Sequence, residues 1–217
     1  MTPTIAHPSP ASPTNSSPAK TSHDLPLVDR SPDQRICFPG TWESFELIQQ
    51  GMSDRRGVKL SFYAGTIEIF MPGAAHSKFV HIVGYFVTTL LLENGIEFVP
   101  SGDKNQAKNG IAGLQADESY CIGPEKDIPD LSIEVVFTSG GPNKLKMYAE
   151  LGTKEVWFWE DGMLSLYHFR SPEQIYEKIT VSELPGLDAL NLDLLERCIL
   201  RAETDFPGAV LMLRTGH

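Results

Sequence analysis

Residues 128–137 read Ile128-Pro129-Asp130-Leu131-Ser132-Ile133-Glu134-Val135-Val136-Phe137. From Asp130 onward the run is almost continuously apolar, which predicts a strand that is buried on both faces, as strands in parallel sheets are. A helical segment follows over residues 144–151 and ends at Gly152, and residues 155–159 form the next apolar strand. The sequence therefore predicts a strand–helix–strand unit inside a sheet.

A hairpin and a long helix precede this unit. Residues 58–62 and 66–70 alternate with period two, and Ala64-Gly65 between them predicts the turn of a β-hairpin. Over residues 76–93 the apolar side chains recur at intervals of three and four, which predicts a buried helix that ends at Asn94-Gly95. The other expected elements are a short helix after an N-cap at Thr41, strands over 96–99, 111–122 and 164–169, and a terminal helix over 190–203. Together they predict an α/β (α+β) fold, a mixed β-sheet flanked by helices.

The 217 residues suit one domain with extensions at both ends. Residues 1–36 are rich in Pro, Ser and Thr and have no hydrophobic period, so we expect a disordered tail there. This tail is either a docking segment or a dispensable extension. We expect the folded domain over residues 37–205 and a C-terminal tail over 206–217.

Composition and charge restrict the class of protein. The net charge of −10 argues against tight, non-specific DNA binding, which relies on a basic face, but is neutral for an enzyme that holds metal ions with carboxylates. The three cysteines form no Cys-x-x-Cys pair, which indicates a reducing compartment, and we expect a cytoplasmic protein. We expect neither a signal peptide nor a membrane span, because the most apolar run, residues 79–92, falls short of the roughly 20 residues required.

Carboxylates on two neighbouring strands are the candidates for chemistry. Glu134 lies in a run that otherwise favours burial, and an ionised carboxylate there costs several kcal/mol unless it is paired or binds a cation. It could pair with Lys144 or Lys146, or it could be a ligand. Asp130 points to the same face by strand parity, and it could equally be an ordinary residue at the start of a strand. On the preceding strand, Asp117-Glu118 is either part of a site or a solvated pair.

Two carboxylates from adjacent strands can hold a magnesium ion, which takes one or two carboxylates and keeps several waters. Such an ion lowers the pKa of a bound water and neutralises charge on a phosphodiester. A nearby lysine would offset transition-state charge. The turn over 138–143 can bring Lys144 back toward the Glu134 strand.

These blocks resemble the PD-(D/E)XK nuclease superfamily and, more closely, its Uma-type branch of restriction endonuclease-like proteins, which is abundant in cyanobacteria. The resemblance covers about residues 41–200 and implies a restriction-endonuclease-like fold. The blocks that carry it are Tyr63–Ile69 with Met71-Pro72 and His76, Ala116–Tyr120, Asp130–Val136, Thr138–Gly141 with Lys144-Leu145, Leu151–Trp157, and Pro185-Gly186-Leu187.

The resemblance implies that Asp117 and Glu134 bind the metal and act in catalysis together with Lys144. The secondary candidates are His76, Glu118, Asp130 and Lys146. His76 either assists a metal-bound water or a phosphate, or is a structural residue at a helix N-terminus. Two positions depart from the family pattern, since Ala116 replaces a proline and Val136 stands where the lysine of Glu-x-Lys is usual.

The function that follows is a metal-dependent endonuclease, a hydrolase with Mg²⁺, or Mn²⁺, as cofactor and DNA as a transient substrate. The resemblance also implies a homodimer, for which we expect Glu155–Trp159 as an edge strand. The competing hypothesis is a catalytically inactive nuclease-like protein that serves for binding or as a scaffold. A third hypothesis is a metal-assisted phosphohydrolase with a small substrate.

Overall fold

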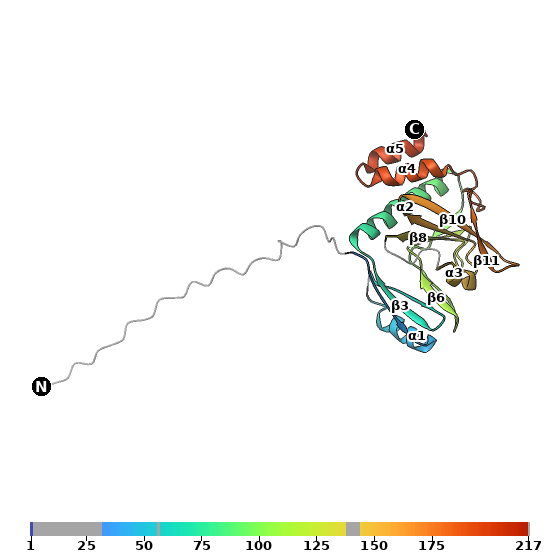
Figure 1. Ribbon diagram of the computed structural model, residues 1–217. Coiled ribbons are helices and arrows are strands. Elements are labelled where there is room, and N and C mark those ends of the chain that lie inside the picture. The colour runs from blue at the N-terminus through green and yellow to red at the C-terminus, as the bar shows by residue number, and fades with distance from the viewer. Residues whose placement is uncertain (2–31, 56, 138–143, 217) are drawn as a thin grey trace.

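A computed structural model describes Met1 and residues 32–55, 57–137 and 144–216. Most of the expected N-terminal tail and the whole turn 138–143 lie outside the described residues. Over the described ranges the chain has an α+β fold with two sheets and five helices, which confirms the predicted fold class (Figure 1). The helices are α1 (Trp42–Gly51), α2 (Ala74–Glu93), α3 (Leu145–Leu151), α4 (Leu192–Ala202) and α5 (Phe206–Thr215).

The strands divide between two sheets. The five-stranded sheet is antiparallel and has the order β1 (Gln34–Pro39), β3 (Thr66–Met71), β2 (Lys59–Tyr63), β6 (Ala112–Gln115), β5 (Asn105–Lys108). The six-stranded sheet has the order β11 (Ile175–Ile179), β10 (Met163–Arg170), β9 (Glu155–Glu160), β8 (Leu131–Val136), β7 (Glu118–Ile122), β4 (Phe98–Pro100). In it β8 and β9 are parallel and the other neighbours are antiparallel, so this sheet is mixed. The predicted strand–helix–strand unit is β8–α3–β9.

The expected strand over 111–122 is two strands that belong to different sheets. β6 pairs with β2 and β5, whereas β7 pairs with β8 and β4. The chain crosses from one sheet to the other at Ala116 and Asp117, where the Asp117 N–H still donates to the Ile133 carbonyl over 3.1 Å. Asp117 therefore lies where the two sheets meet.

β8 is buried on both faces, as predicted, and its two faces have different neighbours. Leu131, Ile133 and Val135 pack in the main core cluster with residues of α2, including Phe79 and Phe86. The alternate residues of the strand, among them Glu134, face the α3 side. The strand thus separates the main core from a smaller apolar cluster on the α3 side, which includes Val136 and Tyr148.

Helix α2 is the core helix, and α4 and α5 lie over it at one end of the molecule (Figure 1). By length and composition alone this helix of 20 residues could cross a membrane. The sequence did not suggest this, because its most apolar run, residues 79–92, is shorter than the helix. Eight of its residues are buried inside the protein, among them Val83 and Val87, so in this fold it packs against the six-stranded sheet.

At the other end, α1 packs on the five-stranded sheet through Phe45, and this contact leaves no room at Gly113 of β6. A Cβ at Gly113 would lie 2.9 Å from Cε1 of the buried Phe45 ring. We expect Gly113→Ala to lower the free energy of unfolding by about 1–3 kcal/mol, measured by urea denaturation. Gly51→Ala is the control, since a Cβ there meets nothing within 4 Å. Equal stability of the two variants would contradict the steric explanation.

Two segments differ from the sequence-based expectation. β9 lies between β8 and β10, so its backbone is paired on both sides, and the expectation that Glu155–Trp159 forms an edge is wrong. The homodimer stays a prediction, and its interface would have to form on a surface other than β9.

The expected tail over 206–217 contains helix α5, whose N-cap Asp205 accepts a hydrogen bond from the Gly208 N–H and whose Phe206 ring stacks on Phe86.

Candidate active site

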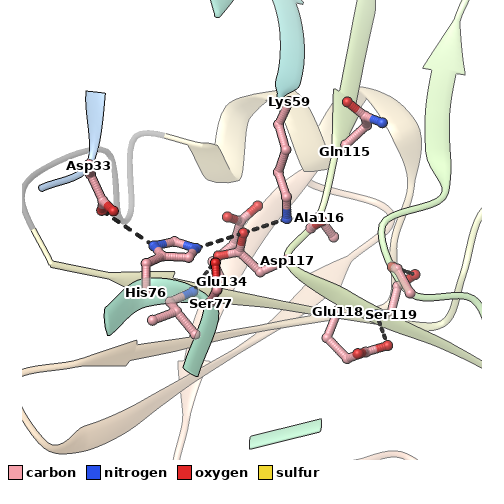
Figure 2. Close-up of polar contacts among 12 residues, drawn as sticks. Asp33, Lys59, His76, Ser77, Gln115, Ala116, Asp117, Glu118, Ser119 and Glu134 are labelled. Atoms are coloured by element: carbon pink, nitrogen blue, oxygen red, sulfur yellow. Dashed lines mark hydrogen bonds and ion pairs between the residues drawn. The ribbon is translucent and has the colours of Figure 1, made fainter. Parts of the chain in front are cut away.

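Asp117 lies at the junction of the two sheets with its side chain almost fully buried (Figure 2). Its Oδ2 accepts a hydrogen bond from the Val135 N–H over 2.7 Å. Its Oδ1 accepts from Nζ of Lys59 on β2 over 2.6 Å, and the same ammonium donates to the Ala116 carbonyl over 2.7 Å. Val135 directly follows Glu134 in β8. The bond to the Val135 N–H therefore keeps the Asp117 carboxylate next to the part of the strand that carries Glu134.

The charge of Asp117 is set by its cationic neighbours. Burial by itself raises the pKa of this carboxyl, but the close approach of His76 and the positive charges of Lys59 and Lys144 outweigh it. The pKa of Asp117 therefore lies well below its usual range, and the side chain is an anion at neutral pH.

Glu134 is 2% exposed and is held by two residues of the α3 segment. Oε2 accepts from Lys144 Nζ over 2.7 Å, and Oε1 accepts from the Tyr148 hydroxyl over 2.5 Å. Burial and the negative charge of Glu134 raise the pKa of Tyr148 well above its usual value, so the phenol keeps its proton and remains a donor. The structure thus contains the pairing of Glu134 with Lys144 that we considered from the sequence.

Lys144 interacts with both carboxylates. Burial lowers the pKa of its ammonium, but the charges of Glu134 and Asp117 outweigh burial, so the net shift is upward. The side chain is therefore a cation at neutral pH. Lys146, the other candidate, is exposed on α3 and lies away from this arrangement. Of the two lysines considered from the sequence, the structure brings Lys144 to the carboxylates.

His76 lies in the first turn of α2 and is 2% exposed. Its Nε2 is 3.0 Å from Asp117 Oδ1, and its Nδ1 is 3.3 Å from Asp33 Oδ2 (Figure 2). The ring packs edge-on against Phe70 with 5.2 Å between the ring centroids. The structure therefore joins His76 to Asp117, which the sequence left open. We call Lys59, His76, Asp117, Glu134, Lys144 and Tyr148 the Asp117 cluster.

Asp130 belongs to a different set of contacts. Its Oδ1 pairs with Lys154 Nζ over 2.8 Å, and its Oδ2 accepts from the Ile122 N–H over 2.8 Å and pairs with Lys126. Burial raises the pKa of Asp130, but the lysines and the Ile122 N–H outweigh burial and lower it. Among the contacts of the described residues none joins Asp130 to the Asp117 cluster. It ties the start of β8 to the end of β7.

Glu118 points away from Asp117, toward Ser119, whose N–H donates to Glu118 Oε1 over 3.2 Å (Figure 2). Its carboxylate lies against Gly84 of α2, where a Cβ would come within 3.0 Å of Oε2. Burial raises the pKa of this carboxyl. Glu118 therefore packs between β7 and α2, on the opposite side from the cluster.

Lys59, Tyr148 and Asp33 were missed by reasoning from the sequence. Lys59 begins an amphipathic strand, where a lysine is ordinary, and its partner Asp117 lies 58 positions further along the chain. Tyr148 had a local signal, because it stands four residues after Lys144 and so lies on the same face of a helix. Asp33 lies in the segment that we assigned to the tail.

A divalent cation would find oxygen ligands in Asp117 and Glu134 and a nitrogen ligand in His76. Over the part of the chain that the structure describes, no three His, Cys, Asp or Glu side chains are arranged as a metal site. The carboxylates are instead paired with Lys59, Lys144 and Tyr148. The donor set still fits a cation, since the nitrogens of the buried His76 make no well-aligned hydrogen bond with any described residue and one of them lies 3.0 Å from Asp117 Oδ1.

Comparison with family models finds a match over most of the chain. A family model described as "Uma2: Putative restriction endonuclease" matches residues 42–202. The matched span contains the whole Asp117 cluster and leaves Asp33 outside. None of the curated proteins compared with the chain matches it.

Proposed function

We propose that this chain, which belongs to the Uma2 family, is an endonuclease that hydrolyses phosphodiester bonds of DNA with a divalent metal ion, Mg²⁺ or Mn²⁺. The observation that carries the proposal is the buried, ionised Asp117 held beside Glu134, with a lysine on each carboxylate. Such a concentration of buried charge costs stability, and strongly perturbed charged groups of this kind cluster at functional sites.

Asp117 and Glu134 would hold the ion in this proposal. A bound divalent cation makes a water more acidic and neutralises charge that develops on the phosphodiester. Tyr148 donates to Oε1 of Glu134 and so fixes the direction of its carboxylate. The Val135 N–H does the same for Asp117. These donors orient the two side chains before any substrate binds.

The two lysines supply positive charge. Because Lys144 remains protonated at neutral pH, it cannot take a proton from water, and its contribution is electrostatic. Lys59 brings a second ammonium from the other sheet, 2.6 Å from Asp117 Oδ1. The missing lysine of Glu-x-Lys, where Val136 stands, is thus replaced in space by lysines from α3 and β2.

A catalytically inactive binding or scaffold protein is the second candidate. The observation that favours it is the neutralisation of both carboxylates by lysines, which a structural ion-pair network would also show. The two functions differ in what they predict for DNA in the presence of metal.

The test is cleavage of supercoiled plasmid by the purified full chain. We expect open-circular DNA to accumulate with Mg²⁺ or Mn²⁺ and no cleavage when EDTA removes the metal. Binding of metal or DNA without cleavage would support the inactive scaffold. Hydrolysis of a small phosphodiester such as bis(p-nitrophenyl) phosphate, with intact plasmid, would indicate a phosphohydrolase with a small substrate.

A further inference from the structure

His76 is a buried side chain whose ring nitrogens make no well-aligned hydrogen bond with any described residue. Each of these nitrogens nevertheless lies within 3.3 Å of a carboxylate oxygen, that of Asp33 or of Asp117. Buried nitrogens are almost always satisfied in folded proteins, so an exception requires a physical explanation. The position of this one, against the ionised Asp117, points to a ligand.

Asp33 gives the imidazole a defined direction. Its Oδ1 accepts from the Gly73 N–H over 2.8 Å, at the N-cap of α2, and Oδ2 is left facing His76 Nδ1. A carboxylate at Nδ1 favours the tautomer with the proton on that nitrogen. The lone pair of Nε2 then faces Oδ1 of Asp117, 3.0 Å away. Two electron-rich atoms face each other stably only when a proton or a metal ion lies between them, and a divalent cation can take the place of the proton that otherwise links Nε2 to Asp117.

We propose that His76 Nε2 and Asp117 ligate the same divalent cation, with Asp33 as the positioning residue that orients the imidazole. A carboxylate behind a metal-binding histidine is the usual arrangement around protein metal ions. The proposal rests on the proposed function, because the cation is the one that would serve the nuclease.

The nitrogen ligand determines which metals suit the site. Mg²⁺ prefers oxygen ligands and gives up its waters reluctantly, whereas first-row transition metals accept imidazole readily. We therefore expect Mn²⁺ and Co²⁺ to bind more tightly than Mg²⁺. Lys59 now shares Oδ1 of Asp117 with His76, so a cation would bind in competition with this ammonium.

Pulsed EPR of Mn²⁺ bound to the full chain tests the proposal directly. We expect a ¹⁴N hyperfine coupling in the wild type, which changes to a ¹⁵N coupling when the histidines are labelled with ¹⁵N. In His76→Gln the coupling should disappear, and Mn²⁺ affinity should fall by about 10–100-fold. Asp33→Asn should weaken Mn²⁺ binding by about tenfold and retain the coupling.

His81→Ala is the matched control, because His81 is an exposed histidine on the same helix and stacks on Phe206. Its Mn²⁺ coupling and affinity should equal those of the wild type. The labelled wild type keeps the test decisive even if a variant fails to fold. Mn²⁺ binding without a nitrogen coupling, or a coupling that persists in folded His76→Gln, would overturn the proposal.

The outcome is separable from that of the proposed function. Plasmid nicking by a wild type that lacks the nitrogen coupling would overturn the His76 ligand and leave the nuclease standing. A histidine coupling without cleavage of plasmid would do the reverse. A wild type that neither binds Mn²⁺ nor nicks DNA would overturn both.

Discussion

Asp117→Asn is expected to lower the rate of metal-dependent plasmid nicking by about 1000-fold. Asparagine has the size of aspartate and can still accept the hydrogen bond from the Val135 N–H. It lacks the charge that would hold a cation and that now pairs with Lys59. The measurement is the initial rate of conversion of supercoiled to open-circular DNA at saturating Mg²⁺ or Mn²⁺.

Asp130→Asn is the matched control. Asp130 is also buried, also lies between two cations and also accepts from a backbone N–H, that of Ile122. Both substitutions remove a paired carboxylate and should lower the thermal midpoint, but Asp130→Asn should keep its nicking rate. Equal loss of activity in the two variants, in step with their loss of stability, would show that Asp117 has a structural role alone.

The pH dependence of stability checks the ionisation of these two carboxylates. The pKa of each is lowered in the folded state, so each stabilises the fold above its unfolded pKa, near 3.9. This contribution is lost as the pH falls through the folded pKa. The stability deficits of both variants should therefore be constant from pH 7 to about 5 and shrink below about 4.

The fold class and one half of the site could be predicted from local pattern. The near-continuous apolar run of β8 indicated burial on both faces, and its single glutamate was conspicuous for that reason. Lys144 lies ten positions after Glu134, at the N-cap of the following helix, so it was within reach of local reasoning. The choice of Asp117 over Asp130 came from the family resemblance, and it stays a prediction; the structure places Asp117 next to the backbone of the Glu134 strand and within reach of the charge of Lys144.

The rest of the site depends on which strands pair, and the sequence does not carry that information locally. The pattern of apolar and polar residues over 112–122 is the same whether the segment forms one strand in one sheet or two strands in two sheets. The sequence therefore did not indicate that the chain crosses between sheets at Asp117. Lys59 meets Asp117 because β2 pairs with β6 although β3, α2, β4 and β5 lie between them in the chain. Asp130 was also a candidate from the sequence, but the structure pairs it with Lys126, four positions before it, and with Lys154, just before β9.

Lys144→Met is expected to lower the nicking rate by about 100–1000-fold, because it removes an ammonium that interacts with both Glu134 and Asp117. Lys59→Met should lower the nicking rate less, by about tenfold, since Lys59 bonds to one of the two carboxylates, that of Asp117, and shares its ammonium with the Ala116 carbonyl. Lys146→Met, on the exposed side of the same helix α3, is the control and should match the wild type. Loss of activity in Lys146→Met with activity retained in Lys144→Met would reverse the assignment of the lysine.

The pH–rate profile distinguishes a charge from a base at Lys144. A lysine that acts as general base must lose its proton, and removing it would change the limb of the profile that reports its pKa. Glu134 and Asp117 raise the pKa of Lys144 despite its burial, so the ammonium keeps its proton over the working range. Lys144→Met should therefore lower the whole profile without moving its limbs, and Lys144→Arg, which keeps the charge, should recover part of the rate. A limb that shifts in Lys144→Met would show that the lysine takes part in proton transfer.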